Sequence, residues 1–219
     1  MKDRGRLIGW TSLVLFLAAL NYSARFTGGG RTSDNNAVYS YSQFAGGIVV
    51  YALWLGAVLW IAAGRRDLLA LRRTTWKWAV LGPAGAFVLI IVVEALVSQI
   101  PLPQSPGREQ GLTPTHWEPA HAGAFAANVV LFAVIAPFVE ELTFRGVGQS
   151  LLRFLGRWPS ILLVGISFGV AHGLVEALLV LVPFGIVLAY LRDRATSIYP
   201  GMAVHAAFNA LALAVSVLR

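Results

Sequence analysis

The chain of 219 residues is 57% hydrophobic and only 12% charged, which is too apolar for an ordinary soluble domain and typical of a polytopic membrane protein. It contains no cysteine, which excludes disulfides, thiolate metal sites and a cysteine nucleophile. The net charge of +7 does not indicate nucleic acid as a partner, because the basic residues fall between apolar runs rather than in one patch. We therefore expect a single integral membrane domain over residues 1–219, surrounded by membrane lipids.

The first half of the chain predicts three membrane spans and a loop. Apolar runs cover residues 7–21, 44–63 and 78–98. No small-residue cleavage site follows the first run, so we interpret it as an uncleaved helix rather than a signal peptide. Residues 101–119, after the third run, hold five of the ten prolines and show no clear hydrophobic periodicity. Residues 1–98 should form three N-terminal spans, and residues 99–121 a proline-rich loop.

The second half of the chain predicts four further spans. A long apolar run begins at residue 122 and continues to about residue 154, and it contains Pro137, which should kink the helix. Shorter apolar runs follow at residues 159–172, 174–191 and 199–218. The sequence therefore predicts a four-span core over residues 122–218 and, for the whole chain, an all-α bundle of about seven transmembrane helices.

The distribution of lysine and arginine predicts the orientation of the bundle. If the N-terminus is inside, twelve lysine and arginine residues fall on inside segments and four on outside segments. Inside segments of membrane proteins are enriched in these residues. The count therefore favours an N-terminus on the inside.

Three ionisable side chains interrupt the long apolar run within six residues: Glu140, Glu141 and Arg145. Ionisable groups inside a membrane are costly and mark candidate functional sites. Glu141 and Arg145 lie one helical turn apart and can neutralise each other. Glu140 points about 100° away, where no local side chain pairs with it. This carboxylate is therefore a candidate proton acceptor or donor.

Two histidines and an asparagine lie in later apolar runs, at His172, His205 and Asn209. A rise of about 1.5 Å per residue puts Glu140 and His172 about 22 and 25 Å from the predicted inside turn near residue 155. The same rise puts His205 and Asn209 about 14 to 20 Å from the inside turn near residue 196. All four can meet in one buried site, which we expect nearer the inside. A lone intramembrane histidine often only bonds a carbonyl, so the prediction depends on the set.

The polar residues form three motifs in chain order: Glu-Glu-x-x-x-Arg at 140–145, Phe-x-x-x-His at 168–172 and His-x-x-x-Asn at 205–209. This ordered triple resembles the CAAX prenyl protease and bacteriocin-processing family (CPBP, or Abi) of intramembrane endopeptidases. The likeness covers roughly residues 122–215 and makes residues 122–218 the expected catalytic core.

The resemblance implies a role for each motif residue. A glutamic-type, CAAX-protease-like enzyme would activate a water with Glu140 and His172. It would stabilise the oxyanion with His205 and Asn209. As supporting residues we expect Glu141 and Arg145 to form a structural pair, and Phe168 to pack beside the site.

A metal site is the alternative interpretation of the same residues. Two histidines and a carboxylate, here Glu140, His172 and His205, can hold zinc with an open coordination position. However, no two histidines lie one turn apart, as they do in the His-Glu-x-x-His helix of a zinc protease. We therefore expect no cofactor and keep zinc as the less favoured alternative.

The expected substrate is a membrane-anchored protein or peptide that is cut near its C-terminus or its anchor. The resemblance implies either a prenylated peptide or a C-terminal sorting signal. The small size and the basic inside segments suit a prokaryotic cytoplasmic (inner) membrane. Two other functions remain open: a non-catalytic scaffold or bacteriocin-immunity protein, and a proton-coupled transporter that uses Glu140 and Glu94.

Overall fold

The structure, a computed structural model, describes residues 3–27, 37–100, 114 and 116–218. Over these residues it contains helices and turns and no strand, which confirms the predicted all-α class. Most of the predicted proline-rich loop lies outside the described residues. In chain order the helices are α1 (Asp3–Thr27), η1 (Ala37–Tyr39), α2 (Tyr41–Ile61), η2 (Arg66–Leu69), η3 (Lys77–Leu81), α3 (Gly82–Val97), η4 (Pro119–His121), α4 (Ala122–Val130), η5 (Leu131–Ile135), α5 (Ala136–Glu141), η6 (Leu142–Gly148), α6 (Gln149–Leu152), η7 (Arg153–Leu155), α7 (Arg157–Ala171), α8 (Leu178–Ala195) and α9 (Tyr199–Ser216).

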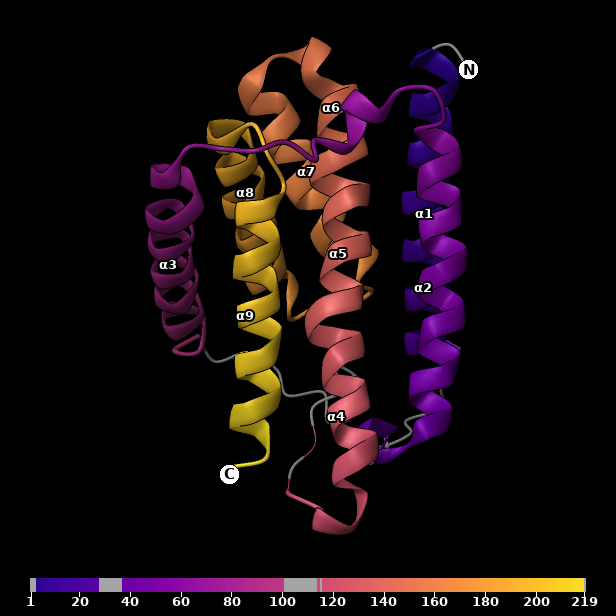
Figure 1. The fold of residues 1–219 in the computed structure, drawn as a ribbon, viewed down its shortest axis with the longest axis vertical. Helices are drawn as coiled ribbons and strands as arrows, with labels where there is room; N and C mark the ends of the chain where they lie inside the picture. The colour runs from indigo at the N-terminus through magenta and orange to yellow at the C-terminus, as the bar shows by residue number, and fades with distance from the viewer. Residues whose placement is uncertain (1–2, 28–36, 101–113, 115, 219) are drawn as a thin grey trace.

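The long helices run roughly along one direction and form a bundle (Figure 1). Within the described residues, four helical segments are long and apolar enough to cross a membrane: Asp3–Ala24, Tyr41–Ile61, Lys77–Val97 and Pro119–Leu155. Helix α7 is apolar but shorter. The chain is therefore an integral membrane protein, while the count of seven spans and the N-terminus on the inside stay predictions.

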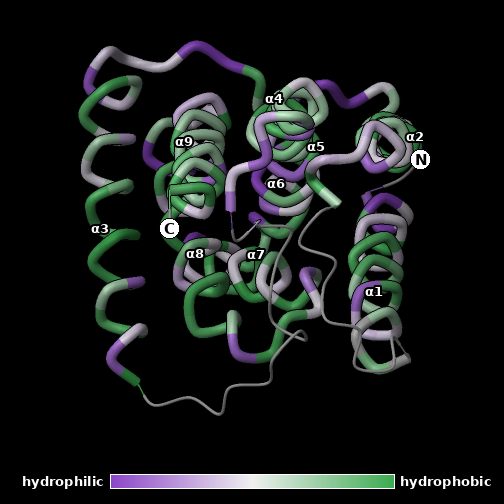
Figure 2. The backbone as a smooth tube through the Cα atoms, turned by 90° about the horizontal axis from the view of Figure 1, so that it is seen from below, coloured by the Kyte–Doolittle hydropathy of each residue, from purple (hydrophilic) through white to green (hydrophobic). Residues whose placement is uncertain are grey.

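The outer faces of the bundle are apolar, as a lipid environment requires. Leu53 and Trp60 on α2 and Val88 and Leu96 on α3 are each more than half exposed. Large apolar side chains exposed to water would be unfavourable by about 25 cal/mol per Å². Figure 2 shows hydrophobic colouring along α1, α2 and α3, and hydrophilic colouring concentrated at helix ends and connections. Lipid contact explains this distribution.

A single rod from α4 to α6 carries the Glu-Glu motif, and two π-helical stretches flank that motif. The first, η5, ends just before Pro137 at the start of α5, and the second is η6. Proline lacks an N–H and clashes with the carbonyl four residues earlier. The wider π turn accommodates the ring, so the effect predicted for Pro137 takes the form of a π-bulge. Such bulges are frequent at functional sites.

The N-terminal helices are fastened to this rod by buried hydrogen bonds. The Nδ2 of Asn128 on α4 donates to the carbonyls of Val38 and Ser40 at the start of α2, each at 3.0 Å. The indole Nε1 of Trp10 on α1 donates to the carbonyl of Thr143 at 2.9 Å. These bonds fix α1 and α2 beside the helix that carries Glu140.

Candidate active site

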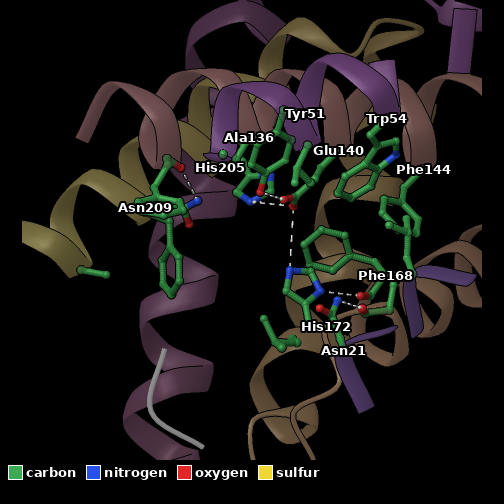
Figure 3. Close-up of a pocket in the computed structure, with 18 of the residues that line it drawn as sticks. Asn21, Tyr51, Trp54, Ala136, Glu140, Phe144, Phe168, His172, His205 and Asn209 are labelled. Atoms are coloured by element: carbon green, nitrogen blue, oxygen red, sulfur yellow. Dashed lines mark hydrogen bonds and ion pairs between the residues drawn. The ribbon is translucent and has the colours of Figure 1, made fainter. Parts of the chain in front are cut away.

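The bundle encloses a cavity of about 730 Å³ whose wall is mostly apolar. Helices α1, α2, α5, α7, α8 and α9 all contribute to it, so residues far apart in the sequence meet there (Figure 3). The polar side chains that reach this wall are Asn21, Ser42, Gln43, Tyr51, Trp54, Glu140, His172, His205 and Asn209. The four residues that the sequence predicted to meet therefore line one cavity.

The carboxylate of Glu140 is buried at the centre of these polar groups. Its Oε2 atom lies 3.8 Å from Nε2 of His172 and 3.7 Å from Nε2 of His205. Its Oε1 atom accepts a hydrogen bond from the hydroxyl of Tyr51 at 3.3 Å. No residue of its own helix pairs with it in these contacts, as predicted, and its neighbours come from α2, α7 and α9.

His172 caps the C-terminal end of α7 with a fixed ring orientation. Its Nδ1 lies 2.7 Å from the carbonyl of Phe168, and because a carbonyl only accepts, Nδ1 carries the hydrogen. A neutral ring then presents Nε2 to Glu140 as an acceptor. The Nδ2 of Asn21 on α1 holds the adjacent turn by donating to the carbonyl of Ala171 at 2.7 Å. No sequence pattern predicted this contact.

His205 is buried on α9 between the aromatic rings of Phe168 and Phe184, whose centroids lie 5.6 and 5.1 Å from its own. Its Nδ1 lies 3.1 Å from Oε1 of Glu141, and its Nε2 faces Glu140. The two carboxylates of the motif therefore hold opposite sides of one imidazole ring.

Glu141 and Arg145 form the predicted ion pair, with 2.8 Å between Oε1 and Nη1. Both side chains are 0% exposed. The guanidinium also donates to the carbonyl of Gly185 at 3.1 Å and lies over the ring of Phe168, 4.3 Å from its centroid. Phe168 thus packs against the arginine and both histidines, which extends the packing role expected for it.

Asn209 lies one turn beyond His205 on α9 and lines the same cavity. Its Nδ2 donates to the carbonyl of Phe132 at 2.8 Å, which leaves the second hydrogen of this nitrogen without a protein acceptor in the described part of the chain. Among the described residues, no hydrogen bond joins Asn209 to Glu140 or to the histidines. Figure 3 shows Asn209 at the cavity wall, with its amide nitrogen bonded to the backbone carbonyl of Phe132.

The expectation that the site lies nearer the inside stays a prediction, because it depends on the orientation of the bundle in the membrane. His172 is at the end of α7 opposite to the turn that precedes Arg157. The cavity continues to Asn21 and to Ser42 in the first turn of α2, at the far end of the bundle. A hydrocarbon core is about 30 Å thick, so depths of about 22 to 25 Å already lie beyond its midpoint.

Sequence reasoning missed the contribution of the first two helices. Tyr51 and Trp54 on α2 line the cavity, and their rings are stacked at 5.6 Å between centroids. Both lie in an apolar run, where an aromatic residue is most simply a packing residue. The only available signal was a tyrosine hydroxyl within a span, since a buried hydroxyl usually finds a partner.

Glu94, the other intramembrane carboxylate, is separate from this site. It is exposed on α3 and lines a second cavity of about 280 Å³ between α3 and α9. Of the residues that line this cavity, only Phe208 and Ala212 also line the first one.

Comparison with known proteins assigns the segment that carries the three motifs. Residues 122–211 match the family model described as type II CAAX prenyl endopeptidase Rce1-like. Neither the comparison with curated proteins nor the comparison with solved structures found a match. The matched residues contain Glu140, His172, His205 and Asn209, and the family is one of proteases, which supports an intramembrane protease. The match over residues 122–211 therefore agrees with the resemblance to CAAX prenyl proteases that the three motifs carry.

Proposed function

We propose that the protein is a glutamic-type intramembrane endopeptidase. It would cleave a peptide bond near the C-terminus or the anchor of a membrane-associated protein or peptide. The observation that carries the proposal is the convergence of two histidine Nε2 atoms on one oxygen of Glu140 at a cavity wall. That convergence lies within the segment that matches a protease family.

In this proposal Glu140 and His172 activate the water. The distance of 3.8 Å between Glu140 Oε2 and His172 Nε2 is too long for a direct hydrogen bond, and such gaps often hold a bridging water. Nε2 of a neutral His172 and an oxygen of an ionised Glu140 both accept hydrogen bonds, so one water would donate to both. Glu140 takes a proton as the water oxygen attacks the carbonyl carbon of the substrate. When the C–N bond breaks, the same proton passes to the leaving nitrogen.

The developing oxyanion would receive hydrogen bonds from α9. Asn209 offers the Nδ2 hydrogen that Phe132 does not take. His205 can donate from Nε2 when its ring carries a hydrogen on both nitrogens, because its Nδ1 hydrogen is directed to Glu141. Donors fixed in advance at the site of developing charge are typically the largest contribution to catalysis.

The alternative zinc site does not fit the side chains as they are placed. Within the described residues, no group of three histidine, aspartate or glutamate side chains is arranged to hold a metal ion, and this includes Glu140, His172 and His205. We therefore derive no step through a metal. A mechanism without a cofactor stays a prediction.

The mostly apolar wall suits a substrate with an apolar group beside the cleaved bond. A prenylated C-terminal peptide is the first candidate, because the family description names prenyl endopeptidases. A sorting signal of an exported protein is the second, and we propose a prokaryotic cytoplasmic membrane as the location. A transporter that uses Glu140 and Glu94 gains no support, since the two carboxylates line different cavities.

The proposal predicts that Glu140→Gln and His172→Ala abolish hydrolysis. Each change removes a group that accepts a proton from the water, and such groups typically contribute about 100-fold or more. The measurement is cleavage of an internally quenched farnesylated peptide ending in a CAAX sequence by purified protein in detergent. A membrane-anchored sorting-signal peptide and an unmodified peptide are compared in parallel, each with and without a zinc chelator.

Glu94→Gln is the matched control, because it neutralises an intramembrane carboxylate outside the site. It should cleave at the rate of the unaltered protein. Full activity of Glu140→Gln and His172→Ala would overturn the glutamic mechanism. Activity that a chelator removes and zinc restores would overturn its metal-free form.

A further inference from the structure

Tyr51 is the one residue outside the family-matched segment whose side chain bonds to Glu140 among the described residues. Its hydroxyl donates to Oε1 at 3.3 Å, whereas both histidines face Oε2. The two carboxylate oxygens are therefore in different environments. One is held by a donor from α2, and the other faces the cavity and the imidazoles (Figure 3).

The position of the hydroxyl is fixed by the packing of α2. Asn128 binds the start of α2, and Gly47 lies against Leu131 so closely that a Cβ there would be 2.3 Å from a leucine methyl. One turn later, the ring of Tyr51 stacks on Trp54 with 13° between the ring planes. The register between α2 and the rod from α4 to α6 is thus set just before Tyr51, and the stacking on Trp54 fixes the ring within α2.

We propose that Tyr51 is a positioning residue for the reaction. It holds Oε1 of Glu140 so that Oε2 is the oxygen that takes the proton from water. The inference rests on the proposed role of Glu140, and it makes an N-terminal helix without any family motif part of the active site.

The first test measures Glu140 without any substrate. A carbodiimide such as dicyclohexylcarbodiimide reacts with carboxyl groups in membranes, and peptide mass spectrometry can follow the rate at which Glu140 is labelled. Tyr51→Phe should raise this rate about tenfold, because Oε1 of Glu140 loses its hydrogen bond. The other charged or titratable groups around the carboxylate are unchanged in this variant: Glu141, Arg145, His172 and His205.

Two further variants serve as controls for this labelling experiment. Glu140→Gln supplies the blank. Tyr41→Phe removes a hydroxyl from the same helix at an exposed position, and its labelling rate should equal that of the unaltered protein. An unchanged labelling rate in Tyr51→Phe would overturn the inference.

The second test separates the hydroxyl from the ring by hydrolysis of the cleavable peptide. If the hydroxyl acts, Tyr51→Phe and Tyr51→Ala both lower kcat about tenfold, and Tyr51→Phe leaves KM unchanged because the cavity keeps its ring. If Tyr51 only packs, Tyr51→Phe has full kcat and only Tyr51→Ala is slow, which would overturn the inference. Loss of activity in Glu140→Gln together with full activity in Tyr51→Phe overturns this inference alone, whereas full activity in Glu140→Gln overturns the proposed function.

Discussion

Glu141 places one carboxylate oxygen between two donors, Nη1 of Arg145 at 2.8 Å and Nδ1 of His205 at 3.1 Å. One side chain therefore neutralises a buried cation and orients a ring of the candidate site. A buried ion pair is weak evidence for stability, because desolvation of both ions opposes their attraction. Removal of one partner is different, since it leaves the other charge buried without compensation.

We predict that replacing both members of the Glu141–Arg145 pair restores stability but does not restore activity. Arg145→Met should lower the free energy of unfolding by about 3–5 kcal/mol, because Glu141 is left as an unpaired buried charge. The double variant Arg145→Met with Glu141→Leu should regain most of that stability and stay inactive, because His205 loses its acceptor. Unfolding in mixed detergent is followed by circular dichroism for the unaltered protein, both single variants and the double variant, which makes a double-mutant cycle. The peptide assay measures the activity of the same four proteins.

Arg65→Met is the matched control for the loss of a paired arginine. Arg65 bonds to Asp67 and Asp3 at the surface, where exposed pairs contribute little. Its unfolding should match that of the unaltered protein. A double variant as unstable as Arg145→Met would show that the pair stabilises the bundle in itself, against the prediction.

Residue spacing predicted those contacts whose two partners share one helix. Glu141 and Arg145 are one turn apart, so the helical period alone brings them together. The three motifs predicted which residues gather near Glu140, but the bond from Tyr51 depends on how α2 packs. No local pattern encodes the register between two helices, so this contact could not be predicted from the sequence.

At the level of helices, α7 and α8 pack closely against each other at Gly165 and Gly185. A Cβ on Gly185 would lie 2.6 Å from the carbonyl oxygen of Gly165, and a Cβ on Gly165 would lie 2.5 Å from Ile186. Small residues allow such backbone contact between membrane helices. Gly185 also accepts a hydrogen bond from Arg145, so this crossing supports the buried ion pair.

We expect Gly185→Ala to destabilise the protein by about 1–3 kcal/mol, because the new methyl group meets backbone atoms that cannot rotate away. The methyl group should also push α7 away from α8. Because α7 leads directly into His172, this displacement should lower the rate of peptide hydrolysis. Gly56→Ala on α2 is the matched change, with no atom within 4 Å of the new methyl group. Equal unfolding curves for the two alanine variants would contradict this role of the crossing.

The long apolar runs predicted the positions of the helices. They did not predict where the regular α-helical bonding is interrupted. The spans predicted from residues 44, 78 and 122 have counterparts in α2, in η3 with α3, and in the rod that begins at α4. The π turn before Pro137 was not predicted, because it depends on how the backbone bonds rearrange around the ring. A sequence pattern places the proline but does not choose between a kink and a bulge.

On the scale of the whole molecule, the basic connections gather at one end. The segment between α2 and α3, the α6–α7 turn, the α8–α9 turn and the N-terminus lie together at the top of Figure 1. Arg157 pairs with Asp193 at 2.8 Å across two of these turns, and Arg65 pairs with Asp3 at 3.0 Å. The clustering is what a cytoplasmic face with an excess of arginine requires.

The cavity extends away from this basic end, toward Ser42 in the first turn of α2. If the basic end is cytoplasmic, the polar rim of the cavity lies on the exported side of the membrane. A substrate would then reach the site from that side, which favours an exported, membrane-anchored peptide over a cytosolic one. The two substrate classes of the proposed function are thereby linked to an orientation that can be measured.

Single cysteines test this orientation on a chain that has none of its own. Ser42→Cys and Arg73→Cys place exposed thiols at opposite ends of the bundle. In intact bacterial cells, a maleimide that cannot cross the membrane should label Ser42→Cys and spare Arg73→Cys until the cells are permeabilised. The reverse pattern would place the N-terminus outside and open the cavity to the cytosol. A cytosolic prenylated peptide would then be the substrate consistent with the structure, so the labelling pattern decides which substrate class reaches Glu140.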